Sequence, residues 1–135
     1  MSSKTTALSR QVGGAHYKGF AIQPVEFALV NNLNTAQANI IKYILRDKNS
    51  RVDDIGKAIH YAELWLDVVQ RYGLPGHGKA LENREVLGLP VIPLHDFIRT
   101  NGLSVEVGDI LLLVVDKPSA RRIRLAISLM GNLSN

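Results

Sequence analysis

The chain has 135 residues, no cysteine and a formal net charge of +4 at pH 7. A hydrophobic content of 46% beside 21% charged residues is typical of a single globular domain and excludes a disordered chain. Without cysteine there is no disulfide and no thiolate zinc site. The N-terminus lacks the apolar core of a signal peptide, and the longest apolar run, 110–115, is too short to span a bilayer. We therefore expect a soluble cytoplasmic protein.

The first half of the chain carries clear helix signals. Pro24 stands where a first helical residue often stands, which predicts a short helix that ends at residue 31. A second helix is expected over 34–47, with the Asn-Thr pair at its start as the cap. After a polar turn, a third and longest helix is expected over 53–72, with Gly73 as a left-handed stop.

The second half gives weaker signals. Residues 74–78 are rich in proline and glycine, which indicates a boundary between two parts of the chain. The sequence of 94–100 predicts a short helix that ends at the following Asn-Gly pair. The valine-rich stretch 104–115 predicts β structure. The apolar residues of 123–130 fit the alternation of a strand and the spacing of a helix equally well, and Gly131 as a stop favours the helix. No internal repeat is apparent.

These elements predict a mainly α fold in three parts. Residues 1–14 form a flexible N-terminus, 15–73 form a helical module made of a short helix and a helical hairpin, and 74–135 form a small α+β segment. The apolar runs of the last part exceed what a short appendage buries alone, so we expect it to build a homo-oligomer.

A polar stripe follows the second predicted helix. Asn39, Lys42, Tyr43 and Arg46 are spaced i, i+3, i+4 and i+7, which brings them to one face, opposite an apolar arc. An ammonium and a guanidinium bind phosphates, an amide recognises a base or sugar edge, and a phenol stacks or hydrogen-bonds. The stripe therefore suits a phosphorylated ligand, and the net positive charge agrees with an anionic one.

A similar stripe follows the third predicted helix, where Asp54, Lys57, Ala58 and Tyr61 share a face. In a hairpin with a short loop the two stripes lie side by side at a groove, and the small Ala58 lets a ligand approach closely. The alternative is two solvated faces, on which the aspartate and the lysine form an ordinary helical ion pair. Both interpretations stay open.

Other patterns are weaker. Residues 73–80 almost match a P-loop, but Ala80 has no hydroxyl and the segment follows a helix. The histidines lack metal-ligand spacing, so no metal site is predicted. The basic residues of 121–124 have no interleaved aromatics, so nucleic acid is not an expected partner. His16, on a glycine-flanked segment with Tyr17, could close over the groove and donate to a phosphate; its plain alternative is polar surface.

Taken together, these residues form a recognisable series. His16-Tyr17, the run 22–27, the stripe within 39–46 and the stripe within 54–61 follow one another in the order and approximate spacing of a phage domain family. Over about residues 15–68 the chain resembles the small domain known as SaV-like or nucleotide kinase, whose members include a kinase of deoxynucleoside monophosphates that lacks a P-loop. The ligand-facing residues that this resemblance implies are His16, Tyr17, Gln23, Asn39, Lys42, Tyr43, Arg46, Asp54 and Lys57.

The stripes and the resemblance lead to a functional hypothesis. We expect a phage-type nucleotide-binding protein of the host cytoplasm, and more specifically a deoxynucleoside monophosphate kinase with a nucleoside triphosphate as phosphoryl donor. Lys42 and Arg46 would neutralise the transferred group, and Asp54 would accept a proton. Two alternatives stay open: a non-catalytic protein that sequesters a host signalling nucleotide, and a helical module that only assembles an oligomer.

Overall fold

The structure is a computed structural model that describes residues 7–9, 19–46, 50–73 and 86–133. Within these ranges the chain is helical and contains no strand. The elements are η1 (Ala7–Ser9), α1 (Pro24–Val30), α2 (Thr35–Leu45), α3 (Arg51–Tyr72), α5 (Leu94–Thr100), α6 (Val105–Val115) and α7 (Ala120–Leu133). The prediction of a mainly α fold is confirmed.

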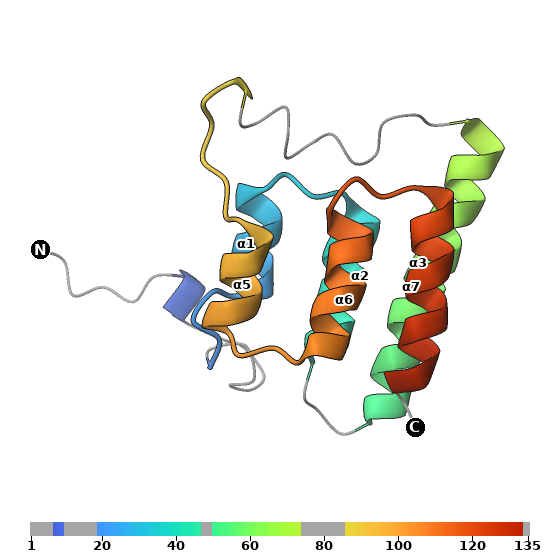
Figure 1. Cartoon of the computed structure of the whole chain (residues 1–135), viewed down its shortest axis with the longest axis horizontal. Coiled ribbons are helices and arrows are strands. Elements are labelled where there is room, and N and C mark those ends of the chain that lie inside the picture. Colours follow the sequence, from blue (N-terminus) through green and yellow to red (C-terminus); the bar gives the residue numbers. More distant parts are fainter. Residues whose placement is uncertain (1–6, 10–18, 47–49, 74–85, 134–135) are drawn as a thin grey trace, which may run out of the picture.

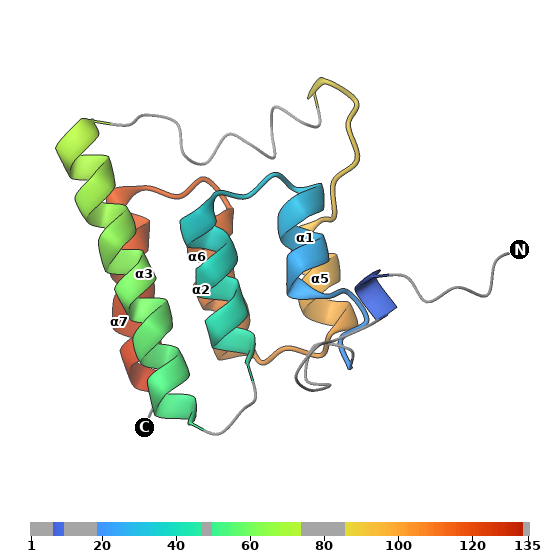
Figure 2. The ribbon, with the colours of Figure 1, turned by 180° about the vertical axis from the view of Figure 1, so that it is seen from behind.

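The α-helices form two layers (Figure 1). In one layer α1, α2 and α3 lie side by side, and α5, α6 and α7 cover them in the same order, as the view from behind also shows (Figure 2). A single hydrophobic core lies between the layers and takes side chains from both. Phe27 of α1 stacks on Phe97 of α5, with ring centres 4.3 Å apart. Many of the apolar residues of α6 and α7 from which we expected an oligomer pack into this core, whereas Leu112 and Leu125 are exposed. The oligomer itself stays a prediction.

The helices of the first layer begin and end at recognisable signals. Asn34 caps α2 in a capping box, because its side chain accepts from the Gln37 backbone N–H at 2.8 Å while the Gln37 amide oxygen accepts from the Asn34 N–H at 2.9 Å. Ser50 caps α3 by accepting from the Asp53 N–H at 3.2 Å, so α3 begins at residue 51 and not at 53 as predicted. Gly73 ends α3 in the left-handed region, with φ 57°, as predicted.

The prediction of β structure over 104–115 is wrong, because this stretch forms α6. Ser104 is its cap and accepts from the Val107 N–H at 3.2 Å. The buried residues of α6 follow helical spacing: Val107, Gly108, Ile110, Leu111, Val114 and Val115. A β-branched residue lowers helix propensity by only about 0.5 kcal/mol, whereas burial of a valine or isoleucine side chain contributes about 1.5–3 kcal/mol. Burial of this face therefore outweighs the strand preference of its valines.

The last segment is the helix α7, as the glycine signal favoured. Its buried residues Ile123, Ala126 and Met130 recur at i, i+3 and i+7, which places them on the face toward α3 and α6. Gly131 is not a stop, since the helix continues through it to Leu133. The described residues of the predicted C-terminal α+β segment therefore contain helices and turns and no strand.

The second layer repeats the first, so the expectation of no internal repeat is wrong. α1 and α5 each have 7 residues and α2 and α6 each have 11, and both pairs begin 70 positions apart (24 and 94, 35 and 105). The α1–α2 connection lies at the top of Figure 1 and the α5–α6 connection at the bottom, so a half-turn about a horizontal axis between the layers relates them. Identical residues occupy the paired positions 22/92, 27/97, 31/101, 33/103 and 40/110.

Two asparagines, Asn31 buried and Asn101 half-buried, join the layers reciprocally. Asn31, at the end of α1, donates to the Ile92 carbonyl at 2.9 Å and accepts from the Ile92 N–H at 2.7 Å. Asn101, at the end of α5, donates to the Ile22 carbonyl at 2.8 Å and accepts from the Ile22 N–H at 3.0 Å. Each half therefore completes the backbone hydrogen bonds of the other just before its first helix.

Candidate functional site

The two polar stripes lie side by side where α2 packs against α3, as predicted. Tyr43 of α2 and Tyr61 of α3 stack with ring centres 6.0 Å apart and an angle of 13° between the ring planes. Both side chains are half-buried. The junction of the two helices is thus covered by two nearly parallel aromatic rings.

Three cations surround the ring of Tyr43, and we call them the cation cluster. Lys42 Nζ lies 5.1 Å, Lys57 Nζ 5.3 Å and Arg46 Cζ 5.9 Å from its centre. Each contact contributes about 0.5–1 kcal/mol at an exposed site, which helps to hold the long side chains together against their mutual repulsion. None of the three forms an ion pair within the described residues. The cluster is therefore a concentration of positive charge that an anion would neutralise.

Arg46 is the least exposed member of the cation cluster. It stands at the C-terminal end of α2, and its Nε is buried with no hydrogen-bond partner in the described part of the chain. A buried donor without a partner costs about 1–3 kcal/mol. An acceptor oxygen that reached this N–H would recover that free energy.

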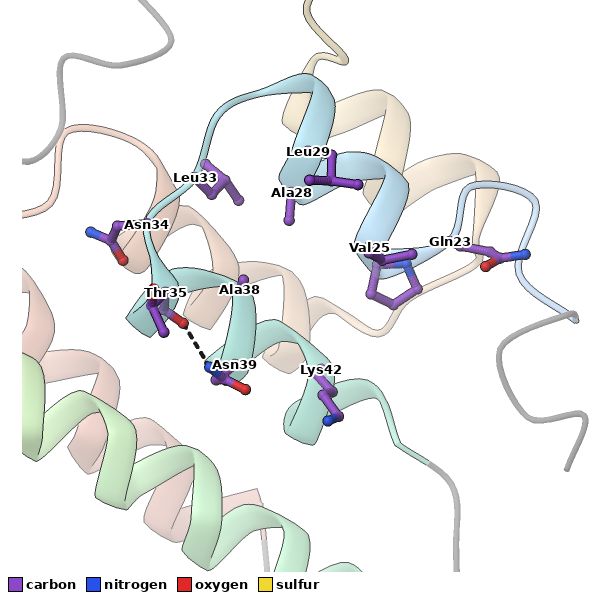
Figure 3. A pocket seen from close by; sticks show the side chains of 11 residues that line it. Gln23, Val25, Ala28, Leu29, Leu33, Asn34, Thr35, Ala38, Asn39 and Lys42 are labelled. Carbon is purple, nitrogen blue, oxygen red and sulfur yellow. Dashed lines mark hydrogen bonds between the residues drawn. The ribbon is translucent and has the colours of Figure 1, made fainter. Parts of the chain in front are cut away.

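A pocket of about 500 Å³ opens between α1 and α2, beside Lys42 (Figure 3). We call it the α1–α2 pocket, and its volume is within the range of small-molecule sites. Its apolar walls are Pro24, Val25, Ala28, Leu29, Leu33 and Ala38, and its polar residues are Gln23, Asn34, Thr35, Asn39 and Lys42. The pocket thus offers a mostly apolar space with a positive charge at one end.

The amide groups of this pocket have defined orientations. The Asn39 side-chain nitrogen donates to the Thr35 carbonyl at 2.9 Å, and the amide oxygen points away from Thr35 (Figure 3). The Gln23 side-chain nitrogen donates to the carbonyl of Leu8 in η1. One of the two N–H groups of each amide is thus engaged within the chain, which leaves the oxygen as an acceptor and the second N–H as a donor for a ligand.

A second, shallower hollow lies on the other side of the cation cluster, and we call it the α3 hollow. Its volume is about 840 Å³, and it is open to solvent. Its residues are Tyr43, Val52, Asp53, Gly56, Lys57, His60, Tyr61 and Leu64. Lys42 lines the α1–α2 pocket and Lys57 lines the α3 hollow, so the cation cluster stands between the two.

Asp54 and Ala58 do not lie at the surface of this groove. Their exposed fractions are 5% and 0%, because this face of α3 packs into the core beneath the tyrosine pair. Ala58 therefore does not provide the close approach to a ligand that the sequence predicts. Asp53, one position earlier, is the exposed carboxylate of this turn and lines the α3 hollow.

Several predicted features fall elsewhere. His16, Tyr17 and residues 74–80 of the P-loop-like stretch lie outside the described residues. Where the structure describes the chain, no three histidine, aspartate or glutamate side chains lie together as metal ligands do. None of the described helices has the length and apolarity needed to cross a membrane. In the basic stretch of α7, Arg122 donates to the Leu112 carbonyl at 2.9 Å.

The α1–α2 pocket itself was not predicted. The sequence points to polar stripes, whereas the pocket is made largely by the apolar residues of α1 and by two alanines that face each other across it, Ala28 and Ala38 (Figure 3). The sequence signal for the pocket is the pair of small side chains, Ala28 on α1 and Ala38 on α2.

Comparisons of the chain with protein-family models, with curated proteins and with solved structures found no match. The fold and the site therefore define the class of protein by themselves: a two-layer helical protein with a cationic, tyrosine-centred surface beside an apolar pocket. The resemblance to phage nucleotide kinases stays a prediction.

Proposed function

We propose that this protein binds a nucleotide, with the phosphates on Lys42, Arg46 and Lys57. The observation that carries the proposal is the convergence of these three cations on the ring of Tyr43, together with an apolar pocket that one of them, Lys42, also lines. Phosphate oxygens accept charge-assisted hydrogen bonds from ammonium and guanidinium groups, which are about twice as strong as neutral ones. The buried Nε of Arg46 adds a donor that has no partner among the described residues.

Binding is tested by calorimetry with deoxynucleoside monophosphates and nucleoside triphosphates, used one at a time. Lys42→Ala should weaken binding about 10–100-fold, because a hydrogen bond to a charged group contributes about 1.5–3 kcal/mol. Arg124→Ala is the matched control, since Arg124 is an exposed cation on α7, away from the cation cluster. Equal losses in both variants, or no binding by the unchanged protein, would contradict the proposal.

We further propose phosphoryl transfer from a nucleoside triphosphate to a deoxynucleoside monophosphate. The supporting observation is that two hollows, one on each side, flank the cation cluster. Phosphoryl transfer needs little beyond positioning and charge neutralisation, so two substrates that meet at shared cations satisfy its main requirement. The attacking oxygen belongs to a phosphate whose second pKa is about 6, so it is already deprotonated at pH 7. Burial of Asp54 is therefore compatible with transfer, because no carboxylate base is needed.

Transfer is tested by incubating the purified protein with ATP and each deoxynucleoside monophosphate and by measuring diphosphate formation. Lys57→Ala should lower turnover at least as much as it weakens monophosphate binding. Turnover by the unchanged protein no higher than that of Lys42→Ala would rule out transfer and leave binding intact. Tight stoichiometric binding with the nucleotide recovered unchanged would identify the sequestering protein instead. Alanine variants of the cation cluster that retain ligand normally would favour the interaction module.

A further inference from the structure

The second layer contains the counterpart of the α1–α2 pocket. Because α5 and α6 repeat α1 and α2 with an offset of 70 positions, every wall position of the pocket has a partner between α5 and α6. Ile98 stands at the position of Ala28, and Gly108 stands at the position of Ala38. A comparison of the two sites within one chain therefore shows which features belong to the first site alone.

The counterpart is filled at its centre by Ile98. Its Cγ2 and Cδ1 atoms lie 3.5 and 3.6 Å from the point that a Cβ on Gly108 would occupy, so the isoleucine packs directly over the glycine backbone. In the first layer the same two positions carry alanines, and the space between them is open. The second groove keeps a hollow of about 510 Å³, similar in volume to the α1–α2 pocket. This hollow is lined by Ile98 and by residues 91–95, 112, 115 and 116, and Gly108 does not line it.

The counterpart has also lost its positive charge. Lys42 corresponds to Leu112, and Arg46 corresponds to Asp116; both replacements line the remaining hollow. An aspartate beside an apolar wall repels phosphate instead of binding it. The two features of the first site, open space between the paired small residues and cations at the rim, are thus absent together in the second.

From this contrast we infer that the α1–α2 pocket receives the base of the nucleotide, that Ala28 and Ala38 set the room for it, and that each chain binds one nucleotide. This inference rests on the proposed function, because it assumes that the phosphates lie on the cation cluster. The base is the part of a nucleotide that suits a mostly apolar pocket next to those cations. The amide oxygens of Gln23 and Asn39 would accept hydrogen bonds from its N–H groups.

The test exchanges the residues of the two layers. A28I/A38G installs in the first layer the pair that the second layer already accommodates, so it fills the centre of the pocket with a packing that this fold tolerates. A28I alone serves as the simpler variant, and I98A, which opens the second groove, is the matched control. Thermal unfolding of each variant shows whether it remains folded. Calorimetry then uses two probes, a deoxynucleoside monophosphate that the unchanged protein binds and inorganic tripolyphosphate, which has no base.

We expect A28I/A38G to weaken binding of the monophosphate at least about tenfold and to leave binding of tripolyphosphate within about twofold. I98A should change neither, and the unchanged protein should bind one monophosphate per chain. Equal weakening of both probes, no weakening of either, or two monophosphates per chain would each overturn the inference. If the unchanged protein binds neither probe, the proposed function itself fails, which is a different outcome.

Discussion

The pairs α1–α2 and α5–α6 have equal lengths, equivalent caps and the same asparagine at the end of the short helix, yet they differ in what they present to solvent. The phenylalanine and asparagine positions are identical in both pairs because they hold the layers together, and the cap positions are similar because they begin the longer helices. The lysine, arginine and paired alanines occur in the first pair alone. The comparison thus distinguishes residues that stabilise the fold from residues that the fold does not require and that are available for function.

The aromatic contact between the layers gives the largest expected effect. Phe27→Ala and Phe97→Ala should each lower the free energy of unfolding by about 3–5 kcal/mol, because each removes a fully buried ring and leaves a cavity beside the other. Denaturant titration followed by circular dichroism measures both. Values that differ by more than about 2 kcal/mol would break the equivalence of the two halves.

The reciprocal asparagines come next. Asn31→Ala and Asn101→Ala should each cost about 2–4 kcal/mol, since each change leaves a backbone N–H and a backbone carbonyl of the other half without a partner. The same titration measures these variants. Asn32→Gly is a suitable control, because Asn32 is exposed and glycine readily adopts its φ of 53°. A destabilisation by the control equal to that of Asn31→Ala would contradict this account.

The helix caps should give smaller effects. Ser104→Ala should destabilise by about 1 kcal/mol, because it removes the side-chain acceptor of the Val107 N–H. Asn34→Ala should cost somewhat more, since it disrupts both hydrogen bonds of the capping box. Thermal unfolding midpoints of the two variants, compared under one buffer, check the order. A larger loss from Ser104→Ala would show that the equivalent caps contribute differently.

The smallest stability effect is expected at the cation cluster. Lys42→Ala should change the free energy of unfolding by less than about 1 kcal/mol, because loss of its contact with the Tyr43 ring is partly offset by less repulsion from Arg46 and Lys57. The side chain is also exposed and forms no ion pair among the described residues. Its effect on nucleotide binding should be far larger, and raised salt should weaken that binding. Paired unfolding and calorimetry measurements check this. A stability loss above about 1 kcal/mol would mean that the cluster supports the fold.

The predictable parts of the fold are those fixed by local chemistry. Asn34, Gly73 and the Asn-Gly pair after α5 mark helix ends because caps and left-handed stops involve only neighbouring residues. α6 was mistaken for β structure because its valines carry a strand preference, and only the spacing of the buried set reveals the helix. The repeat is not evident in the sequence because it is preserved in helix lengths, caps and contacts, with few identical residues.

The site was predictable to a similar extent. Helical spacing brings Tyr43 and Lys57 to facing stripes, and the structure brings them together. The burial of Asp54 was not predictable, because an aspartate at a polar spacing gives no sign that its turn packs into the core. The pocket depends on the small size of Ala28 and Ala38 on different helices, which only the packing of α1 on α2 brings face to face.

The reciprocal asparagines also bear on how the chain reaches this structure. The backbone N–H and carbonyl of Ile22 and of Ile92 form these hydrogen bonds only when the other half of the chain packs against them. The ring contact likewise joins two distant positions, 27 and 97. Closing a loop of that length costs about 4 kcal/mol of chain entropy before any contact compensates for it. We therefore expect refolding to be slower than in helical proteins of the same size with local contacts, and to proceed without a stable folded half.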